Sequence, residues 1–320
     1  MKLIPKGSND LIRVGKSIEI TSKLLQEIES REVALSDDFR VSIPDVNFQK
    51  VLIEKYKIKV IEGTVAYGVI KNVAQIDCKN CSIQSLEGIQ FFTALTSLIC
   101  SKNQLTSIDI TKSSALIFLF IDNNQIISID ITKNYALSFL VIDNNQLASI
   151  DVTNNTALKW LCCSENQLTS LDVTKNTALT RFHCNENQLT TLDVSMNTFL
   201  TDLSCSNNEL TSLDVTKNIA LTSLCCHNNQ LTSIDVTMNT ALTSLCFRNN
   251  QLTSIDVTMN TALTKLICRD NHLTSIDVTK NTALKKLNCS KNQITILDTS
   301  NNNYLDELVY DDNITKIIKQ

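Results

Sequence analysis

The side chains of this sequence best suited to bind a metal are two cysteines and a histidine at regular spacing. Cys225 and His227 stand two residues apart, so they share one face of an extended chain, and Cys246 follows Cys225 by 21 residues. Thiolates and imidazoles are zinc ligands, but a closed site needs four ligands and no fourth is evident. Cys225, His227 and Cys246 are therefore a minor metal-site hypothesis, and we expect no metal and no other cofactor.

Aspartates recur at the same interval. They are Asp109, Asp130, Asp151, Asp172, Asp193, Asp214, Asp235, Asp256, Asp277 and Asp298. This column predicts either a calcium ladder or local bonds from each carboxylate to backbone N–H groups two or three residues on. Local bonds are favoured because the glycine-rich spacing of calcium-binding repeats is absent. No serine–histidine–aspartate series, phosphate loop or paired pocket carboxylates are recognisable, so we expect no enzyme.

These intervals come from an internal repeat with the pattern A-L-x-x-L-x-C-x-x-N-Q-L-T-S-I-D-V-T-K-N-T. Ten units of 21 residues start at Ala94, Ala115, Ala136, Ala157, Ala178, Phe199, Ala220, Ala241, Ala262 and Ala283. A divergent unit precedes them at 74–88, and a truncated unit follows at 304–318. All five Gly and both Pro lie at or before Gly88, so another residue must turn the chain, and Asn is the candidate.

Two extended segments in each unit must position the side chains. The alternation in L-x-x-L-x-C predicts a strand, and L-T-S-I-D-V predicts an extended back wall with Leu, Ile and Val inward. One unit cannot bury its apolar face alone, so the units must stack as parallel strands into a solenoid. An asparagine column should bond the backbone where the chain leaves the strand. Its members are Asn103, Asn124, Asn145, Asn166, Asn187, Asn208, Asn229, Asn250, Asn271 and Asn292.

The unit L-x-x-L-x-C-x-x-N-x-L resembles the leucine-rich repeat consensus over residues 74–317. The segment IPDVNF, which opens a predicted amphipathic helix at 43–57, resembles the N-terminal caps of bacterial leucine-rich repeat proteins, including internalin-like ones. The resemblance implies a β-rich solenoid with one parallel strand per repeat and a small helical cap. We divide the chain into an N-terminal arm of unknown role (1–42), a cap (43–73, strand-like over 58–73), the solenoid (74–303) and a truncated C-terminal repeat or cap (304–320). The arm includes a possible helix at Thr21–Glu32.

Composition narrows the setting and the partner. A net charge of −4 without a basic cluster argues against nucleic acid, and no apolar run is long enough to enter a membrane. The first residues lack a secretory signal pattern, so we expect a cytoplasmic protein, although internalin-like relatives are commonly exported and often attached to the surface. Reduced, buried thiols are expected for most of the twelve cysteines. Those in the repeat's third apolar position are Cys100, Cys163, Cys184, Cys205, Cys226, Cys268 and Cys289. Reactive thiols should be few, chiefly Cys162, Cys225 and Cys246.

The fourth, sixth and eighth residues of each unit should face outward on the strand (concave) side, and the fold does not dictate their types. We call them the fourth, sixth and eighth rows. In these rows we predict a partner-binding patch with an apolar centre and a polar rim. Its residues are Phe118, Phe120, Phe139, Val141, Trp160, Arg181, His183 and Asp202.

The most favoured function is therefore binding of a protein partner whose identity and stoichiometry the sequence leaves open. The eighth row also changes sign, from Asp122 and Asp143 to His227, Arg248 and Arg269. Two interpretations stay open: the change orients a partner, or the row is a solvated face without a binding role. A covering of the patch by residues 1–42 is one alternative, and decay of a nonfunctional array is another. An adhesion or delivered effector protein that binds host receptors or glycans is another, and an ice-binding surface of Thr and Ser is a minor one.

Overall fold

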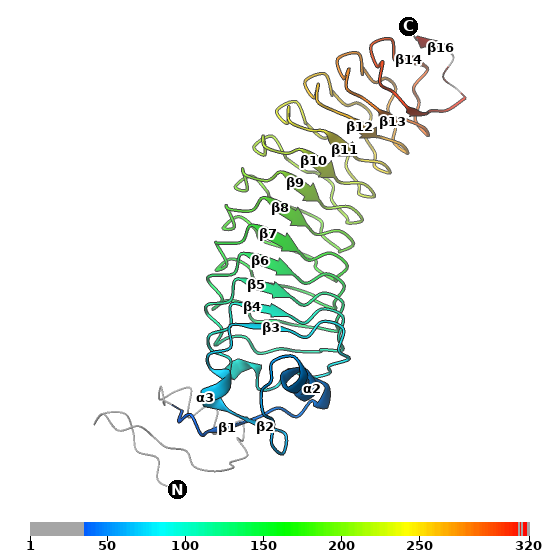
Figure 1. The fold of residues 1–320 in the computed structure, drawn as a ribbon. Coiled ribbons are helices and arrows are strands. Elements are labelled where there is room, and N and C mark those ends of the chain that lie inside the picture. Colours follow the sequence, from blue (N-terminus) through cyan, green and yellow to red (C-terminus); the bar gives the residue numbers. More distant parts are fainter. Residues whose placement is uncertain (1–34, 313, 315, 319–320) are drawn as a thin grey trace. The chain divides into compact units, whose positions relative to one another are not determined.

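The structure is a computed structural model that describes residues 35–312, 314 and 316–318. The chain divides into two compact units, residues 1–136 and 137–320, and each is described here by itself. In both units short strands follow one another once per repeat (Figure 1). Within the described residues, no helix combines the length and apolar character needed to cross a lipid bilayer. The predicted arm lies outside the described residues as far as residue 34, and so does its possible helix at Thr21–Glu32.

The first unit opens with the predicted helical cap. Helix α2 (Val46–Glu54) begins after Asp45, whose Oδ1 accepts hydrogen bonds from the backbone N–H groups of Asn47 and Phe48, each at 2.9 Å. This side chain satisfies donors that the first helical turn leaves unpaired. Phe48, Val51 and Leu52 form the buried stripe of the helix. The amphipathic helix expected within 43–57 is therefore present, although it is shorter than that segment.

Two elements around this helix differ from the sequence prediction. Strand β1 (Arg40–Ser42) pairs antiparallel with β2 (Thr64–Ala66), so ordered cap structure includes residues before position 43. The strand-like segment expected over 58–73 is a strand only at β2, and the short helix α3 (Tyr67–Ile70) follows it. A short apolar run does not distinguish a strand from a single helical turn. Gly68 permits this turn, because a Cβ atom there would lie 2.6 Å from Cβ of Asp37.

The cap is joined to the first repeats by the other oxygen of Asp45. Its Oδ2 accepts hydrogen bonds from the backbone N–H groups of Gln84 at 2.7 Å and Ser85 at 3.1 Å. One carboxylate therefore caps a helix and fixes the divergent repeat beneath it. The repeats of this unit contain the 3₁₀ turn η1 (Ile89–Phe91) and three parallel strands in register. The strands are β3 (Gln75–Asp77), β4 (Ser97–Ile99) and β5 (Phe118–Phe120).

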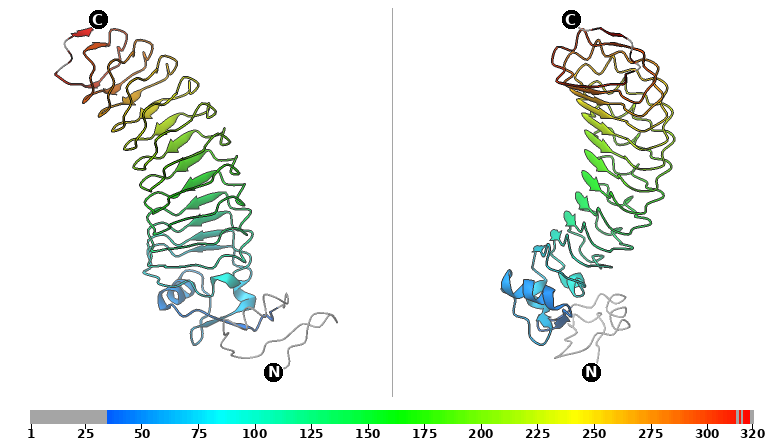
Figure 2. Two further views of the ribbon diagram at one scale, coloured as in Figure 1. Left: turned by 180° about the vertical axis from the view of Figure 1, so that it is seen from behind. Right: turned by 90° about the vertical axis from the view of Figure 1, so that its right-hand side faces the viewer.

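The second unit continues the pattern with nine parallel strands in one sheet, each a single repeat from the next, on the inner side of this unit's curve (Figure 2). They are β6 (Phe139–Val141), β7 (Trp160–Cys162), β8 (Arg181–His183), β9 (Asp202–Ser204), β10 (Ser223–Cys225), β11 (Ser244–Cys246), β12 (Lys265–Ile267), β13 (Lys286–Asn288) and β15 (Glu307–Val309). Near the C-terminal end, β14 (Ile296–Asp298) pairs in parallel with β16 (Lys316–Ile318). The described back wall has no helix, which confirms the predicted β-rich solenoid.

The predicted asparagine column makes the bonds that close each turn. In Asn187, Oδ1 accepts from the backbone N–H of Leu168 at 3.0 Å, while Nδ2 donates to the carbonyl oxygens of Cys163 at 3.0 Å and Cys184 at 3.2 Å. One side chain therefore serves the backbone of its own repeat and of the one before it. The same pattern recurs at Asn208 and Asn229.

A second asparagine column, which the sequence analysis did not single out, lies at the next corner. Its members are buried and include Asn176, Asn197, Asn218, Asn239, Asn260, Asn281 and Asn302. Nδ2 of Asn218 donates to the carbonyl oxygens of Val194 and Asn197, both at 2.9 Å, whereas its buried Oδ1 accepts no hydrogen bond. The amide thus links two successive corners. Its constant place in the 21-residue pattern was the signal available in the sequence.

The aspartate column forms the local bonds that the spacing favoured. Oδ1 of Asp214 accepts from the backbone N–H of Thr216 at 2.9 Å and from its hydroxyl at 2.7 Å. These bonds lower the pKa of Asp214 from its ordinary value. In this structure the aspartate column stabilises the turns at the corners of the repeats.

The ninth residue of every 21-residue unit has a left-handed backbone, although glycine never occupies this position. The φ angles run from 51° to 56° at Lys102, Asn123, Asn144, Glu165, Glu186, Asn207, Asn228, Asn249, Asp270 and Lys291. Asn and Asp tolerate this conformation better than other L residues, and they fill six of these ten positions. Asparagine therefore turns the chain in two ways, by its backbone at the ninth position and by its amide at the tenth.

Candidate functional site

The three-residue strands hold the fourth and sixth rows on the strand face. In most strands the central residue is buried and the two flanking side chains are partly exposed, as in β8, β9 and β10. Residues of the same row therefore lie opposite one another on adjacent strands, as Trp160 and Arg181 do in the fourth row. This register agrees with the sequence assignment of the fourth and sixth rows in the second unit. Cys162 and Ile267 are exceptions, since both side chains are buried.

Five residues of the predicted patch form one connected group, which we call the Trp160 cluster: Phe139, Trp160, Arg181, His183 and Asp202. The rings of Phe139 and Trp160 meet edge to face, with centroids 6.4 Å apart and planes at 80°. Cζ of Arg181 lies 4.9 Å from the Trp160 ring centroid, which is a cation–π contact. The sequence thus identified residues that the fold brings together across β6, β7, β8 and β9.

The polar end of the cluster is an acid between two bases. Oδ2 of Asp202 lies 3.5 Å from Nε of Arg181 and 3.1 Å from Nε2 of His183. All three side chains are at least one quarter exposed, so the ion pairs stabilise the fold little. The cluster is therefore a set of side chains in mutual contact, with two aromatic rings at one end and an acid between two bases at the other.

Cys162 underlies this cluster and differs from its predicted role. Nε1 of Trp160 donates to Sγ of Cys162 at 2.7 Å, and Sγ of Cys162 lies 3.7 Å from Nδ1 of His183. The thiol is 4% exposed, and burial raises its pKa to about 12. The expectation that Cys162 is one of the reactive thiols is therefore wrong: its side chain fills the space beneath the indole. Cys225 and Cys246 are partly exposed, as expected, and so is Cys81.

The remaining patch residues lie on β5 and β6. Val141 is half-buried and opposite Cys162. Phe118 and Phe120 belong to the first unit, where they lie opposite Ser97 and Ile99, and Phe118 is 36% exposed. Their continuity with the Trp160 cluster stays a prediction.

The predicted thiol column is buried throughout and all twelve cysteines are free thiols. Cys163, Cys184, Cys205 and Cys226 are fully buried in successive repeats, and burial raises the pKa of each thiol. A thiol that stays protonated inside an apolar core is a poor nucleophile. This column is therefore core packing, as the sequence analysis expected.

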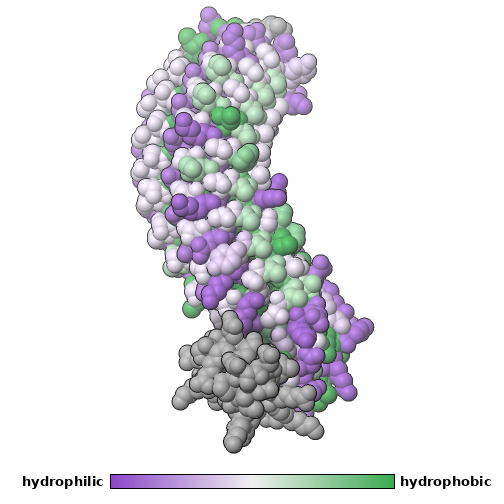
Figure 3. All heavy atoms as spheres, turned by 90° about the vertical axis from the view of Figure 1, so that its left-hand side faces the viewer, coloured by the Kyte–Doolittle hydropathy of each residue, from purple (hydrophilic) through white to green (hydrophobic). Residues whose placement is uncertain are grey.

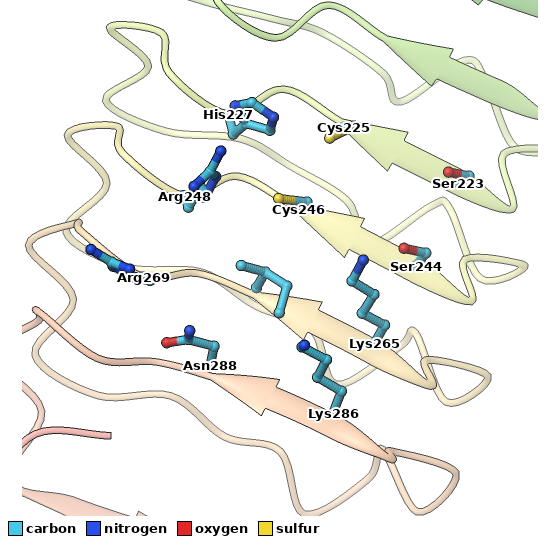
Figure 4. Close-up of a pocket in the computed structure, with 11 residues that line it drawn as sticks. Ser223, Cys225, His227, Ser244, Cys246, Arg248, Lys265, Arg269, Lys286 and Asn288 are labelled. Atoms are coloured by element: carbon cyan, nitrogen blue, oxygen red, sulfur yellow. The ribbon is translucent and has the colours of Figure 1, made fainter. Parts of the chain in front are cut away.

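A second feature of the strand face is a shallow hollow of about 450 Å³ on β10 to β13 (Figure 4). Its lining includes four permanent cations, Arg248, Lys265, Arg269 and Lys286, and no carboxylate. We call it the basic hollow. The basic end of the eighth row was recognisable in the sequence, but its position beside the lysines of the fourth row was not. Only the register of the strands brings the two rows to opposite sides of one depression.

The minor metal-site hypothesis falls in this hollow. Cys225 and Cys246 lie opposite each other on β10 and β11, and His227 lines the same space. Hydrogen bonds from Cys246 and His227 lower the pKa of Cys225, whereas the hydrogen bond with Cys225 and burial raise the pKa of Cys246. Within the described part of the chain, no three His, Cys, Asp or Glu side chains are arranged to hold a metal ion. The cations around this pair also disfavour a divalent cation.

Exposed apolar side chains also occupy the corners that precede the strands, which the sequence analysis did not consider. Met196, Phe199, Ile219, Met238 and Met259 are each more than half exposed. Figure 3 shows apolar and polar patches following one another along one side of the repeats. These exposed apolar side chains lie outside the strand rows, so they can serve as controls for substitutions in those rows.

Comparisons with known proteins agree with this architecture, although no family model matches the chain. Internalin J of Listeria monocytogenes serotype 4b (strain F2365) is 35% identical over 116 residues, which are 34% of this chain and 12% of that protein. The solved functional domain of InlJ from Listeria monocytogenes, described as including a cysteine ladder, has a TM-score of 0.84 at 35% identity. The match covers 89% of this chain and 64% of that one.

A further solved internalin, inlF of Listeria monocytogenes strain 4b F2365, has a TM-score of 0.68 at 20% identity. This match covers 86% of this chain and 95% of that chain and shows the fold alone. The present chain spans only part of internalin J, but it shares with the solved InlJ domain a stack of repeats and a column of cysteines. With its 21-residue repeats and helical cap, the chain is a bacterial, internalin-like leucine-rich repeat protein.

Proposed function

We propose that this chain is a non-enzymatic binding module that holds a protein partner on the strand face of its solenoid. The observation that supports this most directly is the Trp160 cluster. An edge-to-face aromatic pair, a stacked guanidinium and a paired carboxylate occupy rows that are Ser or Lys in other repeats. Tryptophan and arginine dominate the energetic centres of protein interfaces. A rigid aromatic surface loses little conformational entropy when a partner covers it.

The proposed interface has a centre and a rim. Phe139, Val141 and Trp160 supply apolar area, and Arg181, His183 and Asp202 supply hydrogen-bonding groups with defined geometry. Phe118 and Phe120 of β5 occupy the equivalent rows of the preceding repeat and extend the proposal into the first unit. The partner's identity is open. The predicted cytoplasmic location and the alternative adhesion role stay predictions, which cell fractionation with an antibody to the chain would test.

Trp160→Ala tests the proposal. Proteins retained by the immobilised wild-type chain are identified, and the affinity of each purified candidate is measured by calorimetry. Loss of a buried anchor aromatic should weaken binding by about 2 kcal/mol, roughly thirtyfold. The thermal transition should stay nearly unchanged, because the substitution does not touch the asparagine columns or the buried core residues.

Phe199→Ala is the matched control, since it removes an aromatic that is 64% exposed and lies outside the strand rows. It should leave the affinity unchanged. Equal binding by wild type and Trp160→Ala would place the interface elsewhere. Unfolding of Trp160→Ala would show that its own chain covers the cluster.

A further inference from the structure

The basic hollow has a layered arrangement that the Trp160 cluster lacks. The fourth row supplies Lys265 and Lys286 on one side, and the eighth row supplies Arg248 and Arg269 on the other. Between them, the sixth row forms a floor of low polarity from Cys225, Cys246 and Ile267. Figure 4 shows the lysines and arginines along opposite sides of the two thiols.

The charges of the hollow are only partly neutralised. Arg269 pairs with Asp270 at 2.7 Å, and Lys286 pairs with Glu307 at 2.7 Å. Among the described residues, the side chains of Arg248 and Lys265 have no ion pair or hydrogen bond. Two cations therefore remain uncompensated on either side of an apolar floor, in a chain whose net charge is −4. A concave surface of one sign attracts ligands of the opposite sign.

The spacing of the rows matches one kind of anionic ligand. Alternate residues of any extended chain point to the same side and stand roughly 6.6 Å apart, both within a strand of this protein and within a bound peptide. A peptide that lies along β11 and β12 can place an acid over Lys265, an apolar side chain over Cys246 and Ile267, and an acid near Arg248. A sulfated glycan would offer the charges but no apolar group for the floor.

We propose that the basic hollow binds an extended acidic peptide segment in which an acidic, an apolar and a second acidic residue occupy alternate positions. The inference adds the chemistry of a second site on the same face to the proposed function. It does not depend on the Trp160 cluster, because the hollow lies on different strands and has its own contacts. Each carboxylate would meet an uncompensated cation, and the apolar side chain would cover the sulfur atoms and Ile267.

The test is calorimetric titration of the full chain with the blocked pentapeptide Glu-Ser-Leu-Ser-Glu. We expect saturable binding that weakens as salt is raised, since the pairs are near the surface. The peptide Gln-Ser-Leu-Ser-Gln should not bind measurably. A rearranged peptide, Glu-Glu-Leu-Ser-Ser, should bind less tightly because its acids no longer match the rows.

Variants of the protein show whether the peptide binds in the basic hollow. Arg248→Ala with Lys265→Ala should weaken binding of the peptide roughly tenfold or more. The control Lys217→Ala with Lys280→Ala removes two lysines at the corners and should have no effect. Trp160→Ala should bind the peptide normally, so that the two sites can fail independently. The proposal is wrong if the Arg248/Lys265 variant binds the peptide as tightly as the wild type does. It is also wrong if the wild type binds heparin more tightly than the peptide and the same variant loses heparin binding.

Discussion

The strand rows and the corners of the second unit follow opposite rules. At the corners, the same Asn and Asp recur in nearly every repeat, because each side chain bonds the backbone of its own or a neighbouring repeat. In the fourth, sixth and eighth rows, residues as different as Trp160, Asp202 and Lys265 replace one another, since their outer side meets solvent. The contrast teaches that repetition marks the positions that hold the fold, and that departures from it mark the positions available for binding.

The largest expected difference between the outward rows and the buried core is in thiol reactivity. Cys225 is partly exposed in the basic hollow, and hydrogen bonds from Cys246 and His227 lower its pKa. Cys205, in the core column, is fully buried with its pKa raised. Iodoacetamide should label Cys225 at least about a thousandfold faster than Cys205, because Cys205 reacts only when the repeat opens.

The labelling rate of Cys225 should also level off at a lower pH than that of a free thiol, because hydrogen bonds lower its pKa. Mass spectrometry of digests would assign the sites, and Cys225→Ser should remove the fast phase. Rapid labelling of Cys205 in the native protein would contradict the packing of the column.

The next largest effect should be the loss of stability when one amide of the predicted asparagine column is removed. Asn187→Ala leaves the backbone N–H of Leu168 without its acceptor and removes one donor each from the carbonyl groups of Cys163, Cys184 and Asn185. We expect the free energy of unfolding to fall by about 3 kcal/mol, which urea denaturation followed by circular dichroism would measure. Gln188→Ala, at the next and exposed position, should change stability little. Similar stability of the two variants would show that water replaces the amide.

A smaller loss is expected from a polar atom in the cysteine column. Cys205→Ser puts a hydroxyl where burial is complete, at a cost of about 1 to 2 kcal/mol in unfolding free energy. Cys246→Ser, on the partly exposed sixth row, should cost less than half as much. Thermal denaturation of both variants beside the wild type gives the comparison. Equal losses would mean that the sixth row supports the fold as much as the core column.

The smallest effect belongs to one exposed member of the aspartate column. Asp214→Asn keeps an oxygen that accepts from Thr216, so stability at neutral pH should change by no more than about 0.5 kcal/mol. The pKa of Asp214 is lowered in the folded chain, so the carboxylate's contribution is present above its ordinary pKa and is lost as pH falls through the lowered value. Urea denaturation at neutral and acidic pH should show the two proteins converging in acid.

The repetition of the sequence is the reason that so much of the fold was predictable. Each column contains about ten instances of one environment, so the strands, the inward Leu and the bonding Asn were assigned with their correct roles. The cap was harder, because it occurs once. Its helix was recognisable from Asp45 and the apolar stripe, but the pairing of β1 with β2 joins segments more than 20 residues apart and has no local signal.

In the candidate site, the residues that share a row could be predicted from the sequence, but contacts between different rows could not. The residues of the Trp160 cluster were identified because strand register follows directly from the repeat. Cys162 was misjudged, since an outward position does not reveal that the neighbouring indole covers the thiol. The basic hollow was missed for a related reason: its two cationic sides come from different rows, and each row alone indicates only a solvated surface.

The left-handed residue at the ninth position has a consequence for how stable this array can become. Glu186 adopts a φ of 52°, a conformation that strains an L residue other than Asn or Asp by about 1 kcal/mol and does not strain glycine. Glu165, Lys102 and Lys291 stand in the same position in other repeats. The chain therefore folds with strain that single glycine substitutions would remove one repeat at a time. Such changes leave the strand rows untouched, and each raises the thermal tolerance of this scaffold only by the amount that the relieved strain exceeds the backbone entropy that glycine loses on folding.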